Sequence, residues 1–150
     1  MNGVPQKCLT EHQKTQFRVE EANSASVIFH NPDGHRIEEV KVDDCVFDGG
    51  DGKRCDYFLN VTGANKSIFV ELKGGNVEDA ILQLKATTDY FRAVLKKKVI
   101  WVIAHSDNPR FDTTKQVFED KIRSNHHAKP VVGVSPLEYY ISSPPQTPAG

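Results

Sequence analysis

The stretch KRCDYFLNVTGANKSIFVELKG, residues 53–74, contains the pattern that decides the fold. Apolar side chains alternate over residues 55–61, and an apolar run fills the middle of residues 67–72. Such short patterns are typical of β-strands, whereas the glycine and asparagine of residues 62–66 are typical of a turn. We therefore expect two strands that pair as a hairpin and end at the glycines of positions 74 and 75.

The sequence that follows predicts a helix and then a buried strand. Over residues 77–95, apolar side chains recur every three or four positions, which marks one buried helix face. Asn76 suits the N-cap, and the acidic residues that follow it suit the positive end of the helix dipole. Residues 99–104, VIWVIA, form a continuous apolar run, which indicates a strand buried on both faces.

The rest of the chain carries weaker patterns. We expect a short helix over residues 15–22, a hairpin formed by residues 27–30 and 36–42 around the turn NPDG, a second helix over 111–124 and a short strand over 131–134. This order predicts an α/β domain with a mixed central sheet flanked by helices. Residues 1–141 fit one domain, and residues 142–150, rich in Pro, Ser and Thr, are expected to be a disordered tail.

Composition limits the location and the partners. The 19 basic and 20 acidic residues argue against a general electrostatic coat for nucleic acid, but they do not exclude an acidic metal site. The three cysteines, an odd count without CxxC spacing, are expected to be reduced thiols. No apolar stretch reaches the roughly 20 residues of a membrane helix, and residues 1–10 lack the apolar core of a signal peptide. We expect a cytoplasmic protein.

Three charged residues stand at the ends of the two hairpin strands. Asp56 begins the first strand, and Glu71 lies near the end of the second, so pairing brings them together at the open end of the hairpin. Lys73 follows Glu71 by two residues and shares its face of the strand. Two close carboxylates repel each other unless a cation lies between them, and oxygen ligands favour Mg²⁺, with Mn²⁺ as the alternative. The backbone carbonyl of Leu72 is a further candidate ligand.

This set of residues suits phosphodiester hydrolysis. A divalent cation polarises a scissile phosphate and lowers the pKa of a bound water. A lysine beside the carboxylates can orient or deprotonate that water, or stabilise the charge that develops on the phosphate.

Asp56, followed by an apolar run and Glu71-Leu72-Lys73, resembles the PD-(D/E)XK nuclease superfamily, with Cys55 in place of the proline of its name. The resemblance covers roughly residues 20–104 and implies a restriction-endonuclease-like core with the order αβββαβ. It also implies that a glutamine of the following helix, Gln83, joins the site. A carboxylate of the first helix often joins the metal site as well, which leaves Glu20 and Glu21 as candidates.

The expected activity is a Mg²⁺- or Mn²⁺-dependent nuclease that acts on nucleic acid, DNA rather than RNA, and that forms a homodimer if it cuts both strands. One alternative is a catalytically silent nuclease-fold protein that binds nucleic acid or a protein partner, for example in a defence or toxin system. Another is a non-nuclease α/β interaction domain. For Glu71 and Lys73 themselves, the alternative to a functional role is an exposed ion pair at a strand end. A zinc site at His126 and His127, or a nucleophilic Cys55, has no supporting ligand or partner pattern.

Overall fold

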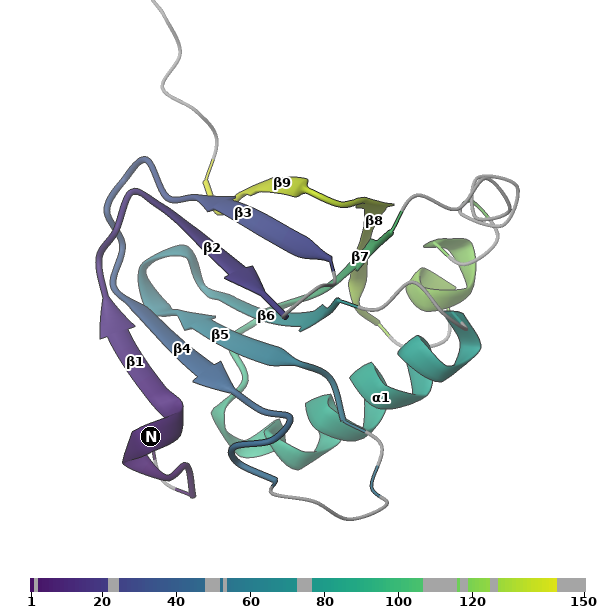
Figure 1. Cartoon of the computed structure of the whole chain (residues 1–150), viewed down its shortest axis with the longest axis horizontal. Coiled ribbons are helices and arrows are strands. Elements are labelled where there is room, and N and C mark those ends of the chain that lie inside the picture. Colours follow the sequence, from purple (N-terminus) through teal and green to yellow (C-terminus); the bar gives the residue numbers. More distant parts are fainter. Residues whose placement is uncertain are drawn as a thin grey trace, which may run out of the picture.

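The computed structural model describes residues 1, 3–21, 25–47, 52, 54–72, 77–106, 116, 119–124 and 127–142. Within these ranges the chain builds an α/β domain from two β-sheets and one long helix (Figure 1). No helix among the described residues is long and apolar enough to cross a membrane.

The larger sheet has six strands in the order β1-β4-β5-β6-β7-β8. Their bounds are Leu9–His12 (β1), Ile37–Lys41 (β4), Tyr57–Val61 (β5), Lys66–Glu71 (β6), Lys98–His105 (β7) and Lys129–Val134 (β8). The pairs from β1 to β6 are antiparallel, whereas β6–β7 and β7–β8 are parallel. The sheet is therefore mixed, as the sequence predicted, and the carboxyl ends of β6, β7 and β8 share one edge.

The smaller sheet has three strands in the order β2-β3-β9. Their bounds are Gln16–Glu20 (β2), Ser26–His30 (β3) and Leu137–Tyr140 (β9). Strand β3 is antiparallel to β2 and parallel to β9. This sheet packs against one face of the larger sheet through a buried apolar cluster that includes Phe17, Phe29, Leu59, Ile68 and Val102. We call it the inter-sheet cluster.

Helix α1 (Val77–Tyr90) covers the opposite face of the larger sheet (Figure 1). Leu84 packs there with Phe58, Phe69 and Trp101 in a second buried cluster, the helix-side cluster. The domain thus has three layers: α1, the larger sheet and the smaller sheet. Three short 3₁₀ helices, η1 (Gln6–Cys8), η2 (Thr62–Ala64) and η3 (Arg92–Val94), and a helical turn at residues 119–124 complete the described regular structure.

The segment around residues 57–71 and the helix after it form the expected elements. Strands β5 and β6 pair as an antiparallel hairpin, and α1 follows them, ending at Tyr90 rather than at residue 95. Strand β7 is buried along most of its length, and β8 includes the strand predicted over residues 131–134. The helical turn at 119–124 agrees with the end of the helix predicted over 111–124. Residues 111–115 and the tail from 143 onward lie outside the described residues.

The helix predicted over residues 15–22 was wrong, because this segment contains strand β2. Phe17 and Val19 are buried, and the residues between and beside them are exposed. A burial period of two suits a strand, and β3 supplies the paired edge. Glu20 therefore ends a strand and Glu21 follows it, so the first helix of the order αβββαβ is not found among the described residues.

The hairpin predicted around the NPDG turn was also wrong. The turn itself forms, since the Gly34 N–H donates to the Asn31 carbonyl (3.0 Å) and Gly34 has a φ of 64°. The strands on its two sides, however, belong to different sheets. The buried Asn31 side chain donates to the Lys14 carbonyl (3.0 Å) and so fixes the chain where it passes from one sheet to the other. Strand β9 was not expected.

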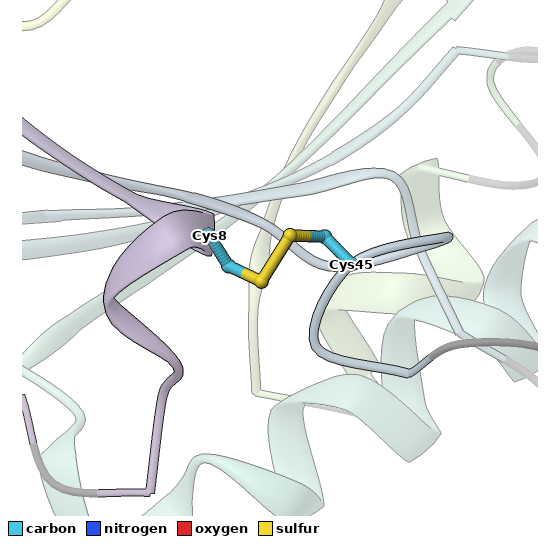
Figure 2. The surroundings of a disulfide bond; sticks show 2 residues. All are labelled: Cys8 and Cys45. Atoms are coloured by element: carbon cyan, nitrogen blue, oxygen red, sulfur yellow. A yellow bond between two sulfur atoms is a disulfide. The ribbon is translucent and has the colours of Figure 1, made fainter.

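The prediction of three reduced thiols was wrong for two of them. Cys8 ends η1 and Cys45 lies in the turn after β4, and the two form a disulfide bond with a Cα–Cα distance of 5.7 Å (Figure 2). The antiparallel pairing of β1 with β4 brings these flanking segments together. Cys55 remains a free, buried thiol.

Candidate functional site

The β5–β6 hairpin positions both predicted carboxylates. Tyr57 is the register partner of Val70. Asp56 directly precedes Tyr57 and Glu71 directly follows Val70, so the two acidic residues occupy adjacent positions of neighbouring strands. Both are removed from solvent, with 2% of Asp56 and 1% of Glu71 exposed. Buried carboxylates are unfavourable unless hydrogen bonds, a cation or a basic group compensate for lost hydration.

Asp56 is held in place by the backbone around it. Its Oδ2 accepts a hydrogen bond from the Leu72 N–H (2.8 Å), and its own N–H donates to the Val70 carbonyl (3.0 Å). Its carbonyl accepts from the Val42 N–H (2.9 Å), which ties it to the end of β4 as well. The bond from the Leu72 N–H orients the carboxylate, and the two backbone bonds fix the position of Asp56 beside β6 and β4.

Glu71 is the last residue of β6. Side chains alternate along a strand, and Phe69 belongs to the helix-side cluster while Val70 belongs to the inter-sheet cluster. The Glu71 carboxylate is therefore on the face that α1 covers, where its Oε2 is buried.

The thiol of Cys55 lies near both carboxylates. Burial raises the pKa of this thiol, and the negative charges of Glu71 and Asp56 raise it further. The two carboxylates thus act on one thiol, which agrees with their adjacent positions in the hairpin. The raised pKa keeps the thiol protonated at neutral pH, so Cys55 is not suited to be a nucleophile.

Helix α1 is tied to the same corner of the sheet by Thr87. The Thr87 hydroxyl accepts a hydrogen bond from the Cys55 N–H (2.8 Å) and donates to the Gln83 carbonyl (2.8 Å). Gln83 therefore lies one helical turn before the contact with the hairpin, and its side chain is partly exposed. Its predicted role in the site stays a prediction.

The remaining predicted ligands differ in their surroundings. The Glu20 carboxylate pairs with Arg18 (3.8 Å), and the Glu21 carboxylate pairs with Lys41 (3.5 Å). Glu20 ends strand β2 and Glu21 comes directly after it, so neither residue lies on a helix. Their role as metal ligands stays a prediction. Lys73 lies outside the described residues.

The donor atoms at the hairpin end fit a hard cation. Asp56 and Glu71 contribute carboxylate oxygens, and the Leu72 carbonyl follows Glu71 directly, which is the ligand chemistry of Mg²⁺ or Mn²⁺. Among the residues that the structure describes, no group of three His, Cys, Asp or Glu side chains is arranged to hold a metal ion. An ion here would therefore take two carboxylates, and water and substrate phosphate would fill its other positions.

His105 is a residue that the sequence analysis missed. It ends β7, only 1% of it is exposed, and its Nδ1 donates to the Ser106 carbonyl (2.9 Å), so that Nε2 is the nitrogen with the lone pair in the neutral ring. Glu71 is the register partner of Ile103, so His105 lies two residues further along the adjacent strand on the same face. Strand spacing and rise place the Cα atoms of His105 and Glu71 roughly 8 Å apart.

A sequence signal for His105 did exist. It is the polar residue that directly follows the apolar run 99–104, and the carboxyl end of a buried parallel strand is a common place for ligand-binding residues.

Comparison of the chain with protein-family models, with curated proteins and with solved structures gave no match.

Proposed function

We propose that the protein is a metal-dependent nuclease that hydrolyses phosphodiester bonds of nucleic acid, DNA rather than RNA. The observation that carries the proposal is the burial of Asp56 and Glu71 at adjacent positions of β5 and β6. Carboxylates in such a place favour a bound cation, and a divalent cation beside a lysine suits attack of water on a phosphodiester.

The chain's own groups would have distinct roles. Asp56, oriented by the Leu72 N–H, and Glu71 would bind Mg²⁺ or Mn²⁺ together with the Leu72 carbonyl. The ion, when bound, supplies Lewis-acid activation of the phosphate and of a water molecule. Lys73 would orient that water, and Gln83 is proposed to assist from α1.

The order of elements supports a restriction-endonuclease-like core as the finer description of the fold. Strands β4, β5 and β6 are consecutive and antiparallel, α1 follows them, and β7 then pairs with β6 in parallel. This order matches the last five elements of αβββαβ. In place of the first helix the chain has β1, β2 and β3, so any carboxylate added from this region, Glu20 or Glu21, would come from the end of a strand.

Cleavage assays test the proposal. The purified chain is incubated with supercoiled plasmid, linear duplex, single-stranded DNA and RNA in Mg²⁺ or Mn²⁺. Asp56→Asn and Glu71→Gln keep the side-chain shape but remove the charge, and we expect each to slow cleavage by about 100-fold or more. Glu138→Gln, an exposed carboxylate on β9, is the matched control and should leave the rate unchanged.

Unchanged cleavage by Glu71→Gln would overturn the assignment of the site. Binding of nucleic acid without cleavage under every metal condition would favour the alternative of a catalytically silent nuclease-fold protein.

Double-strand cleavage by a chain with one site would require two copies. We propose a homodimer for this activity. Sedimentation of the chain with and without duplex DNA tests this, and a monomer that cuts both strands in one binding event would contradict it.

A cytoplasmic location is also part of the proposal, and the Cys8–Cys45 pair gives it a sharp test. Reducing compartments keep such thiols apart, whereas oxidising compartments keep them bonded. The structure has this pair bonded, which is the state that an oxidising compartment keeps. Thiol labelling of the protein taken directly from cells is therefore the test, and reduced Cys8 and Cys45 would support the cytoplasmic location. A fully bonded pair would contradict the cytoplasmic location.

A further inference from the structure

Lysine residues gather at the edge of the larger sheet that is opposite the carboxylates. Lys66 begins β6, Lys98 begins β7 and Lys129 begins β8, and these three strands are parallel neighbours. Lys66 is the register partner of Lys98, and Lys129 is the partner of Ile100, two residues further along β7. Three positive charges therefore follow one another across three adjacent strand ends.

The lysines also share a face of the sheet. Ile68 and Ile100 belong to the inter-sheet cluster, and Lys66 and Lys98 each precede one of them by two residues, so they point to the same side. Lys66 confirms this direction, because its Nζ donates to the Tyr139 hydroxyl (3.2 Å) and to the Ile141 carbonyl (2.5 Å) in and after β9. The lysines thus lie where the edge of the larger sheet meets the smaller sheet.

A cavity of about 430 Å³ opens at this place. It is lined by Lys66, Lys97, Lys98, Val99, Ile100, His127, Lys129 and Tyr139. The lining has four lysines and no carboxylate. Among the residues that the structure describes, none of these lysines forms a salt bridge.

The backbone of the cavity wall is fixed by Asn65, which adopts the left-handed conformation (φ 55°) at the hairpin turn. The Asn65 carbonyl accepts from the Lys98 N–H (3.1 Å), and its side-chain Oδ1 accepts from the Lys97 N–H (3.2 Å). These bonds tie the start of β7 to the start of β6. The backbone of Lys97 and Lys98 is therefore fixed before any ligand arrives, so that only their side chains have to be ordered on binding.

The charges in the cavity repel one another. Burial lowers the pKa of Lys66, and the neighbouring charges of Lys98 and Lys129 lower it further. A bound anion would offset this repulsion, and lysines are common ligands of phosphate groups.

We infer that this lysine cavity is a binding site for a compact polyphosphate group, the di- or triphosphate of a nucleotide or a short inorganic polyphosphate. Its volume lies in the range of small-molecule sites, and its positive charge suits several phosphates close together. A nucleic-acid strand, by comparison, is bound along an open basic groove with aromatic stacking platforms. The concave shape favours the compact ligand.

This site is separate from the proposed nuclease centre. Lys66 and Glu71 are the two ends of β6, roughly 17 Å apart by the rise of a strand, and their side chains are on opposite faces. The inference therefore does not depend on the nuclease proposal, and metal-free binding measurements test it alone.

Isothermal titration calorimetry with sodium triphosphate and the whole chain, without divalent cations and at about 0.1 M salt, is the direct test. We expect one equivalent to bind. Lys98→Ala/Lys129→Ala removes two exposed lining lysines and should weaken binding by about tenfold or more, because each lost charge-assisted hydrogen bond reduces affinity. The control Lys14→Ala/Lys121→Ala removes the same net charge from exposed positions outside the cavity and should retain the affinity.

A second arm compares sodium triphosphate with ATP to distinguish an inorganic ligand from a nucleotide. An equal loss of triphosphate affinity in the two double variants would overturn the assignment of the site, as would the absence of triphosphate binding. Capture of a single-stranded oligonucleotide that depends on Lys98 and Lys129, without triphosphate binding, would also overturn it. If Lys98→Ala/Lys129→Ala fails to fold, Lys97→Glu at an exposed lining position is tested in its place, and it should likewise weaken triphosphate binding.

Discussion

At the scale of single residues, the site depends on one buried carboxylate that is already well oriented. Asp56 Oδ2 accepts the Leu72 N–H, so the aspartate contributes to the fold as well as to the proposed metal site. Asp56→Asn retains a carbonyl oxygen that can accept this bond, whereas Asp56→Ala leaves the donor without that acceptor. We expect Asp56→Ala to lower the unfolding free energy by about 1–3 kcal/mol, and Asp56→Asn to lower it by less. Urea denaturation of the two variants measures the difference, and equal stabilities would contradict the role of the bond.

His105 carries a second prediction at this scale. If its Nε2 contacts the substrate of the proposed nuclease, His105→Asn should slow cleavage by about tenfold or more, since general acid–base groups contribute at least this much. Asn can still donate to the Ser106 carbonyl, so the variant should fold. Mn²⁺ affinity should be unchanged, because the proposed ion is bound by Asp56 and Glu71, and no group of three His, Cys, Asp or Glu side chains among the described residues is arranged to hold a metal ion. A variant with full cleavage activity would show that His105 is structural only.

The pairing of Asp56 with Glu71 could be predicted from the sequence, because strand periodicity and one hairpin turn suffice to bring them together. His105 could not be predicted in the same way. Its place beside Glu71 depends on the parallel register of β6 with β7, two strands that are separated in the chain by helix α1. A register between distant strands leaves no local pattern.

At the scale of elements, Thr87 joins α1 to the hairpin. Its hydroxyl accepts the buried Cys55 N–H, and a valine of the same shape cannot do so. Thr87→Val is expected to lower the unfolding free energy by about 1–3 kcal/mol. Thr10→Val, at an exposed position of β1, is the matched control and should change it by less than about 0.5 kcal/mol. Equal effects would show that the Thr87 bond does not stabilise the packing of α1.

The strength of the local pattern decided which elements could be predicted. Helix α1 and strand β7 have long apolar patterns, and both were expected. Strand β2 has only two buried residues, Phe17 and Val19, and its charged neighbours suggested a helix. The sequence around the NPDG turn specified the reversal of the chain but not the sheets that its two arms join. That choice depends on pairing partners elsewhere, β2 for one arm and β1 for the other.

At the scale of the whole molecule, the Cys8–Cys45 bond closes a loop across a sequence separation of 37 residues. Loop-closure entropy predicts that its reduction lowers the unfolding free energy by about 2–4 kcal/mol. Urea denaturation with and without a reducing agent measures this, and Cys8→Ala/Cys45→Ala should show no response to the agent. An equal response of the double variant would assign the effect to another group, and the absence of any response in the wild type would show that the bond does not stabilise the fold.

The sequence predicted a mixed central sheet flanked by helices. The sheet is mixed and α1 covers one of its faces, but the smaller sheet covers the other face, where a helix was expected. The smaller sheet is assembled from β2 and β3 near the start of the chain and β9 near its end, so its existence depends on contacts over more than a hundred residues. The disulfide could not be predicted for the same reason, since the pairing of β1 with β4 is what brings its two cysteines together.

The central claim is that Asp56 and Glu71 together hold a divalent cation. Anomalous diffraction from a crystal soaked in Mn²⁺ tests it most directly. The expected result is one Mn²⁺ peak bound by an oxygen of each carboxylate at about 2.1 Å, lost in Asp56→Asn/Glu71→Gln. Mn²⁺ bound elsewhere, with these two carboxylates contacting only protein atoms, would contradict it.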